Sequence, residues 1–69
     1  MEDIRDCKGR LVCKIEPFDG FIESAYKRQI TKTRLPIGGD FIIERDGTRT
    51  IVTRYNTNEI DVESQDLTM

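Results

Sequence analysis

The sequence predicts a mainly β protein: a small, single-domain antiparallel β-barrel or rolled sheet of about five short strands. Glycine turns recur along the chain, in KGRLV (8–12), DGFI (19–22) and DGTRTIV (46–52), and β-branched, aromatic or aliphatic residues follow each of them. Short strands separated by such turns, at roughly 8–12-residue spacing, are typical of small barrels and sandwiches. The 69 residues suffice for one domain, expected over residues 1–64, with 65–69 as a frayed tail.

The first element expected is a hairpin whose turn lies at residues 8–9. Glycine adopts a positive φ at little steric cost, which suits a tight turn at this point. In the strand that follows, alternation places Leu11, Cys13 and Ile15 on one face and Val12 on the other. We assign the first three to the core.

The middle segment allows two interpretations. Its spacing of i, i+3, i+4, i+7 and i+8 favours a helix over about 20–30, which would make the fold α+β. The residues in this stripe are Ile22, Ala25, Tyr26, Gln29 and Ile30. Alternatively, FIESAY (21–26) and QITKTRL (29–35) form two strands around a turn at 27–28, although that turn contains no glycine. We favour the strands, because the second is rich in threonine and Pro36 disfavours helix at the residue before it.

The clearest element is a hairpin over residues 40–55. Asp46-Gly47 is a strong signal for a type I′ turn, since both central positions of that turn require a positive φ. A two-residue loop sets Glu44 opposite Arg49 as an opposite-charge pair. It also divides the apolar side chains between two faces, with Phe41, Ile43 and Val52 on one and Ile42, Ile51 and Tyr55 on the other. We assign the first set to the core and leave the second open between a partner surface and a second core.

Residues 36–39, PIGG, raise the question of a phosphate-binding loop. Such a loop needs a helix after its glycines, with the helix N-terminus directed at the anion. The chain continues instead with DFIIER (40–45), an apolar run that ends at the hairpin turn. We therefore interpret PIGG as a connection between strands. Further on, EIDVE (59–63) alternates apolar and acidic residues and predicts a short edge strand.

The composition argues against catalysis and against a metal or cofactor site. The chain has no histidine, so the usual base for a serine or cysteine nucleophile is missing. The two cysteines, Cys7 and Cys13, are too few for a four-ligand zinc site. Acidic residues are abundant but fall at turns or at alternate strand positions. We expect a non-catalytic protein with no cofactor, no metal and no small-molecule substrate.

A cytoplasmic location is expected. The N-terminal segment MEDIRDCKGR (1–10) is charged and lacks the apolar core of a signal peptide. No apolar stretch approaches the roughly 20 residues that span a bilayer, so we expect no membrane association. We interpret both cysteines as reduced thiols, with Cys13 buried in a strand.

Charge is distributed unevenly, although the net charge is only −2. Residues 26–34 carry four cations and no acid, whereas residues 56–69 carry four acids and no base. In the two-strand interpretation, Ile30, Lys32 and Arg34 share a face that a phosphate backbone could follow. A nucleic-acid-binding β-barrel is therefore our alternative function, and its candidate residues are Tyr26, Lys27, Arg28, Lys32 and Arg34.

The function that we predict first is a small binding module that acts through protein–protein contact. Its candidate residues are Ile42, Ile51 and Tyr55, which would bind a protein partner or a second copy of the chain, as in a dimer. The acidic segment at 56–69 could steer a basic partner toward this surface. An accessory or inhibitor protein of a mobile element or phage would fit a chain of this size, an expectation that rests on chain length and on no particular residue.

Overall fold

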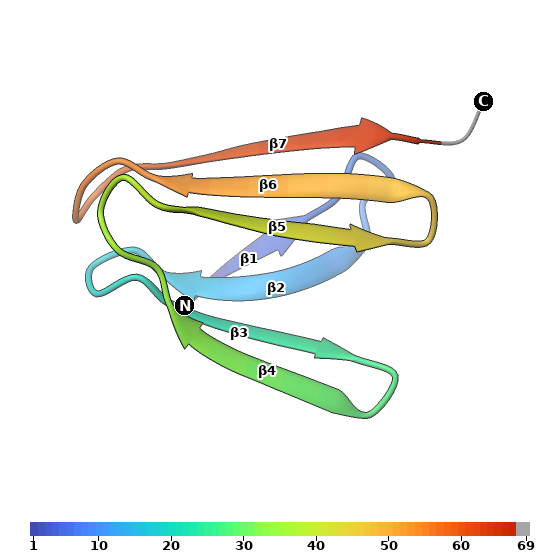
Figure 1. Cartoon of the computed structure of the whole chain (residues 1–69), viewed down its shortest axis with the longest axis horizontal. Coiled ribbons are helices and arrows are strands. Elements are labelled where there is room, and N and C mark those ends of the chain that lie inside the picture. The colour runs from blue at the N-terminus through green and yellow to red at the C-terminus, as the bar shows by residue number, and fades with distance from the viewer. Residues whose placement is uncertain (68–69) are drawn as a thin grey trace.

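The computed structural model describes residues 1–67 and contains strands and turns but no helix in that range. Four antiparallel strands form one sheet, here called sheet A, in the order β1-β2-β3-β4, and three form sheet B, in the order β5-β6-β7 (Figure 1). The strands are β1 (Glu2–Arg5), β2 (Leu11–Glu16), β3 (Phe21–Tyr26), β4 (Gln29–Arg34), β5 (Asp40–Arg45), β6 (Thr48–Arg54) and β7 (Ile60–Asp66). The prediction of a mainly β, antiparallel domain is thus confirmed.

The barrel in that prediction is not what the chain forms. Seven strands in residues 1–67 replace the expected five, and the two sheets are not joined into a closed barrel. The turn at residues 36–39 separates them: the N–H of Gly39 donates to the carbonyl oxygen of Pro36 at 2.9 Å, and Gly38 takes a φ of +86°. This turn carries the chain from the end of β4 to β5 without pairing the two strands. PIGG is therefore a connection between strands, as predicted, and a strand follows it where a phosphate loop would need a helix.

The helix considered over about 20–30 does not form. β3 and β4 pair across a turn at Lys27-Arg28, and Glu23 stands opposite Lys32. Both turn residues have positive φ, 48° for Lys27 and 71° for Arg28, so the turn has the backbone signs of a type I′ hairpin without any glycine. Pairing along all six residues of each strand outweighs the local cost of these two conformations.

The hairpin of β5 and β6 has the register that the sequence predicts. Ile42 is opposite Ile51, and Glu44 is opposite Arg49. Asp46 and Gly47 have φ of 52° and 77°, as a type I′ turn requires. The expected edge strand near the C-terminus is β7, which continues through residues 65 and 66; residues 68–69 of the expected tail lie outside the described range.

The assignment of Leu11 to the core was wrong. Between Ile4 and Arg5 the register of β1 and β2 shifts, so that Ile4 is opposite Cys13 and Arg5 is opposite Leu11. Val12 is the extra residue of this β-bulge, and it is buried while the Leu11 side chain is exposed. A bulge changes which face a side chain takes, and simple alternation cannot anticipate it.

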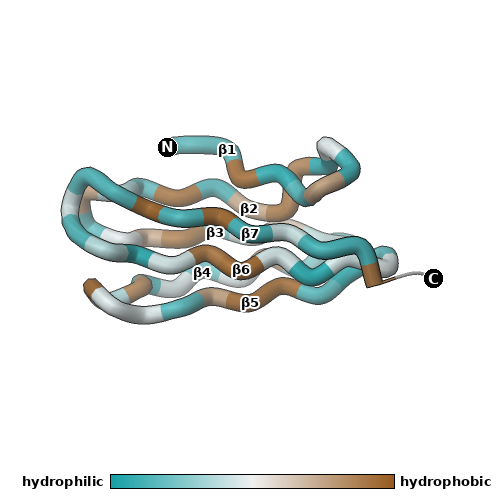
Figure 2. The backbone as a smooth tube through the Cα atoms, turned by 90° about the horizontal axis from the view of Figure 1, so that it is seen from above, coloured by the Kyte–Doolittle hydropathy of each residue, from teal (hydrophilic) through white to brown (hydrophobic). Residues whose placement is uncertain are grey.

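The core lies between the inward faces of the two sheets. Figure 2 shows hydrophobic and hydrophilic segments alternating along the strands, as expected where one face of each sheet is buried. The fully buried apolar residues include Ile15, Ile22 and Val52, and Phe41 packs against them. The complete set of buried apolar side chains is Ile4, Val12, Cys13, Ile15, Ile22, Leu35, Ile43 and Val52. None of the described residues belongs to a helix long and apolar enough to cross a bilayer.

Polar side chains connect the two sheets at both ends of the core. Asp6 is buried in the β1–β2 turn and accepts hydrogen bonds from the N–H groups of Lys8 and Arg10 and from Thr48 Oγ1 of sheet B. At the other end, the buried Arg54 side chain reaches from β6 to the β2–β3 turn. Throughout residues 1–67, every buried side-chain nitrogen or oxygen has a hydrogen-bond partner.

Candidate functional site

The outward face of sheet B carries an apolar pair that lies outside the core formed by the described residues. Ile42 on β5 and Ile51 on β6 are direct cross-strand partners and point away from the core, because their neighbours Ile43 and Val52 point into it. Ile42 is 57% exposed and Ile51 is partly buried. The structure therefore places this pair outside the core.

Polar contacts flank the isoleucine pair on the same face. Arg49 Nε donates to Glu44 Oε1 at 2.9 Å on one side of it, and Thr53 Oγ1 donates to Asp40 Oδ1 at 2.8 Å on the other. Each contact joins a residue of β5 to its direct register partner on β6. The result is a short apolar centre with a polar rim, and the rim holds the side chains on either side of the isoleucines in place.

Tyr55 is exposed but lies apart from the isoleucine pair. It follows the last residue of β6, and its N–H donates to the carbonyl oxygen of Glu59 at 3.0 Å in the β6–β7 loop. Its side chain is 56% exposed. Since Thr53 lies between Ile51 and Tyr55 along the strand, the tyrosine marks the end of this face. Of the three predicted residues, the structure brings Ile42 and Ile51 together.

Acidic residues from β7 extend the same face. Asp61 and Glu63 are register partners of Thr53 and Ile51 on β6, so they share the outward side of sheet B. With Asp40 and Glu44, this side presents four carboxylates and, in Arg49, one guanidinium among these strands. The surroundings of the isoleucine pair are therefore negatively charged.

The basic segment proposed for nucleic acid is exposed, but its aromatic residue is already engaged. The Tyr26 ring is covered by the Arg45 guanidinium at 4.4 Å and by Lys27 Nζ at 5.3 Å from the ring centroid. Its hydroxyl donates to Asp46 Oδ1 at 3.0 Å. A base could stack on this ring only after displacing the Arg45 guanidinium.

The cations on β4 are interleaved with acids of the same sheet. Lys32 stands opposite Glu23, and Arg34 Nη2 lies 3.8 Å from Asp19 Oδ2. Lys27 and Arg28 lie in the turn between β3 and β4. The four cations thus lie along one edge of sheet A but do not form an uninterrupted positive face.

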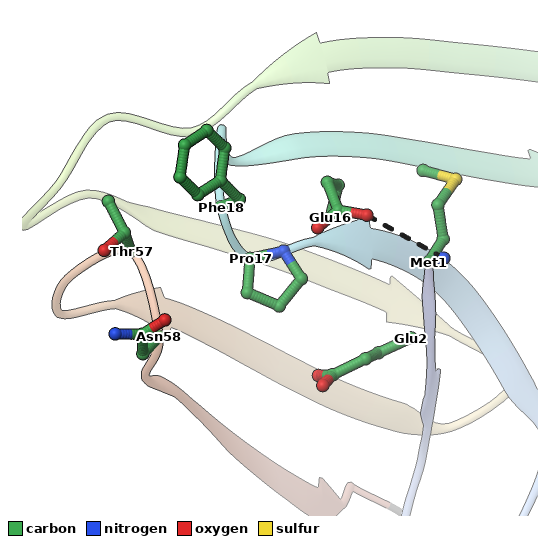
Figure 3. A pocket seen from close by; sticks show the side chains of 7 residues that line it. All are labelled: Met1, Glu2, Glu16, Pro17, Phe18, Thr57 and Asn58. Carbon is green, nitrogen blue, oxygen red and sulfur yellow. Dashed lines mark ion pairs between the residues drawn. The ribbon is translucent and has the colours of Figure 1, made fainter.

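An open cleft lies where the start of β1 meets the β2–β3 turn and the β6–β7 loop (Figure 3). Its volume is about 350 Å³, and its lining residues are Met1, Glu2, Glu16, Pro17, Phe18, Thr57 and Asn58. Glu16 Oε2 is 3.9 Å from the terminal nitrogen of Met1. Phe18 is 72% exposed at the rim and does not belong to the core. The cleft offers two carboxylates but no nucleophile paired with a base.

Both cysteines are free thiols, and they differ in their surroundings. Cys7 is exposed in the β1–β2 turn, whereas Cys13 is buried in β2. Burial raises the pKa of the Cys13 thiol to about 11, although the charge of Arg45 opposes the shift. Among residues 1–67, no three His, Cys, Asp or Glu side chains are grouped so that they could hold a metal ion.

Comparisons of the chain with protein-family models, with curated proteins and with solved structures found no match.

Proposed function

We propose that this protein is a non-catalytic binding module that contacts a protein partner through the outward face of sheet B. The observation that carries the proposal is the cross-strand pair of Ile42 and Ile51, held on the outside of the molecule. An exposed side chain is common, but a paired apolar centre with a polar rim matches the anatomy of protein interfaces. Tyr55 at the end of this face adds a large side chain with a polar tip.

The charges around the isoleucine pair indicate what kind of partner surface would fit it. Asp40, Glu44, Asp61 and Glu63 surround the isoleucines with negative charge. Complementary charge at an interface speeds association and selects the partner. We therefore expect a partner whose contact surface has an apolar centre and a basic rim.

Residue substitution on this face provides the test. Wild-type protein and the Ile51→Glu variant are immobilised, and the proteins that each captures from the cytosol of the source cell are compared. A partner should bind the wild type and be lost from the variant, because a carboxylate replaces the apolar centre beside Glu63. Circular dichroism and thermal unfolding must show that the variant remains folded, as expected for an outward side chain.

Ile37→Glu is the matched control. Ile37 is 58% exposed, close to the 57% of Ile42, but it lies in the 36–39 turn and away from sheet B's outward face. The same charge change there should leave capture intact, and Ile42→Glu should abolish it. If Ile37→Glu, Ile42→Glu and Ile51→Glu all lose capture of the partner to the same degree, the added negative charge prevents binding wherever it is placed. Unfolding of Ile51→Glu would show that this face is a core position, and either result would overturn the proposal.

Nucleic-acid binding through the basic segment is the second candidate, supported by the exposure of Lys27, Arg28, Lys32 and Arg34 along one edge. The engaged Tyr26 ring and the acids facing Lys32 and Arg34 make it the weaker one. If it holds, binding of a single-stranded oligonucleotide should weaken steeply as salt is raised, because phosphate contacts release counterions. No mobility shift with single- or double-stranded oligonucleotides at low salt would exclude it.

A cytoplasmic location belongs to the same proposal. The two free thiols support it, because reducing conditions keep cysteines unpaired. Fractionation of the source cell, with the protein detected by antibody, tests this directly.

A further inference from the structure

β4 is an edge strand that residues 1–67 leave exposed on both faces. All six of its residues are exposed, whereas β3 beside it holds two buried residues, Ile22 and Ser24. In Figure 1, β4 lies at the edge of sheet A farthest from β7. In the described chain, β4 pairs with β3 alone. The N–H and C=O groups on the other side of the β4 backbone are therefore open for pairing with a further strand.

A row of alternating charge crosses sheet A and ends at this open edge. Asp3 on β1 is opposite Lys14 on β2, Lys14 is opposite Glu23 on β3, and Glu23 is opposite Lys32 on β4. Lys14 and Glu23, in the middle of the row, are thus each flanked by charges of opposite sign, whereas Asp3 and Lys32, at its two ends, each have a neighbour on one side only. Cross-strand pairs of opposite charge stabilise a sheet, so the next strand should place an acid opposite Lys32.

A strand with the matching acids is β7, one of the two edge strands of sheet B. Asp61, Glu63 and Gln65 of β7 point to its outward side, as Ile30, Lys32 and Arg34 of β4 do on sheet A. When β7 of one molecule is laid antiparallel beside β4 of another, one register sets Lys32 opposite Glu63 and Arg34 opposite Asp61. In the same register, Thr31 faces Ser64 and Thr33 faces Val62 on the inward side.

We infer that β4 pairs with β7 of a second copy of this chain, which joins sheet A of one molecule to sheet B of the next. Pairing between two identical edges is disfavoured by like-charge repulsion. β4 against β4 brings together Lys32 and Arg34, and β7 against β7 brings together Asp61 and Glu63. The contact is therefore heterologous: in a pair of molecules, the one whose β4 is used still offers its β7, and the other still offers its β4. Such contacts build open chains or rings. This contact uses the edges of β4 and β7 and does not involve the Ile42–Ile51 pair itself, although Asp61 and Glu63 also border that pair; it does not depend on the proposed function.

The assembly is weak and sensitive to salt. Each exposed cross-strand charge pair contributes a few tenths of a kcal/mol, and the two pairs are screened as ionic strength rises. Backbone hydrogen bonds along the strands provide the remaining affinity, as in other cases of β-strand addition. Association should therefore be seen at high protein concentration and low salt, and should be lost on dilution.

Charge exchange between the two edges is the decisive experiment. Sedimentation velocity of the full chain at millimolar concentration and low salt should show oligomers for the wild type. Lys32→Glu and Glu63→Lys should each form clearly fewer oligomers alone, because each change replaces the Lys32–Glu63 pair by two like charges. A mixture of the two variants should recover the oligomers, because Lys32 of one variant meets Glu63 of the other, and the two substituted side chains also carry opposite charges. The double variant carrying both changes should again form oligomers.

Controls separate edge pairing from other associations. Arg28→Glu changes the net charge as Lys32→Glu does but lies in the turn, so it should leave the oligomers at no less than about half their wild-type amount. Ile42→Ser alters the outward face of sheet B away from β7 and should leave them unchanged; their loss would assign association to the isoleucine face. A wild-type chain that stays monomeric at every concentration would overturn the inference, as would a mixture of the single variants that forms no more oligomer than either variant alone.

Discussion

The guanidinium of Arg54 donates a hydrogen bond to the carbonyl oxygen of Phe18 at 2.7 Å, across the interior from sheet B to the β2–β3 turn of sheet A. Two further bonds leave the same side chain, Nε to Pro17 O at 3.2 Å and Nη1 to Leu35 O at 3.0 Å. In the described part of the chain, no carboxylate pairs with this buried cation, so three carbonyl dipoles compensate its charge. One side chain thus ties β6 to the turn that displays Phe18 and to the end of β4.

Replacement of Arg54 by methionine should lower the free energy of unfolding by about 3 kcal/mol, because one buried and two part-buried carbonyl groups lose a charged donor at once. Arg54→Lys should be intermediate, since an ammonium cannot reach all three oxygens in the planar arrangement of a guanidinium. Urea denaturation gives the free energy of unfolding of each variant. Arg34→Ala is the control: its side chain is 69% exposed and should change stability by no more than about 0.5 kcal/mol. A small effect at Arg54 would mean that water replaces its bonds.

Gly20 should tolerate no side chain. It has a φ of +78°, and a Cβ at this position would collide with the carbonyl oxygen of Leu35, whose N–H bonds back to Gly20 O at 2.8 Å. Gly20→Ala should therefore cost about 3 kcal/mol or more, from the conformation and the collision together. Gly9 has a nearly equal φ of +79° with nothing within 4 Å of a Cβ. Gly9→Ala should cost only about 1 kcal/mol, and equal losses in thermal unfolding would contradict the role of the collision.

Local signals in the sequence were enough to predict the pairing of neighbouring strands. Asp46-Gly47 determined the β5–β6 register, and with it the outward position of Ile42 and Ile51. The β3–β4 hairpin was harder to predict, because Lys27-Arg28 has no glycine and the helical stripe competed with it. Here the gain from strand pairing overrode local preference.

Features that depend on distant residues were not predictable in the same way. The division into two sheets follows from which strands stay unpaired across the 36–39 turn, and no local pattern encodes that. The bulge that exposes Leu11 is likewise a property of the pairing with β1. The buried position of the Arg54 side chain was not predictable, because an arginine in a strand is usually a surface residue. The isoleucine pair of the candidate site was found from the hairpin register. The exposure of β4 could be recognised only from the arrangement of the two sheets.

The two thiols should differ sharply in reactivity. Burial raises the pKa of Cys13 to about 11, against the opposing charge of Arg45, so its thiolate is scarce at neutral pH. Cys7 is exposed. A thiol-specific disulfide reagent should therefore titrate one cysteine in the native protein and two in denaturant, and Cys7→Ser should abolish the fast reaction. Rapid labelling of Cys13 in the native protein would show that β2 opens locally.

Asp6 should make the fold sensitive to acid. Burial disfavours its ionised form, but the N–H groups of Arg10 and Lys8 and the Arg10 guanidinium, 2.9 Å from the carboxylate, outweigh burial and hold the pKa below its ordinary value. A lowered pKa means that the unfolded chain binds a proton more readily than the native protein does. The contribution of Asp6 to stability is therefore complete above about pH 4, the ordinary pKa of an aspartate, and disappears as the pH falls through the lower native value.

Asp6→Asn isolates this contribution, since an amide keeps the shape of the side chain but carries no charge. The variant should be less stable than the wild type at neutral pH, and the two unfolding free energies should converge as the pH is lowered below about 4. Asp3→Asn, at a side chain that is 48% exposed, should follow the wild-type curve. Because Asp6 also accepts a bond from Thr48 of sheet B, its protonation loosens the contact between the sheets as well as the turn. Urea unfolding at a series of pH values measures the three curves, and parallel curves for Asp6→Asn and the wild type would exclude the role given to this carboxylate.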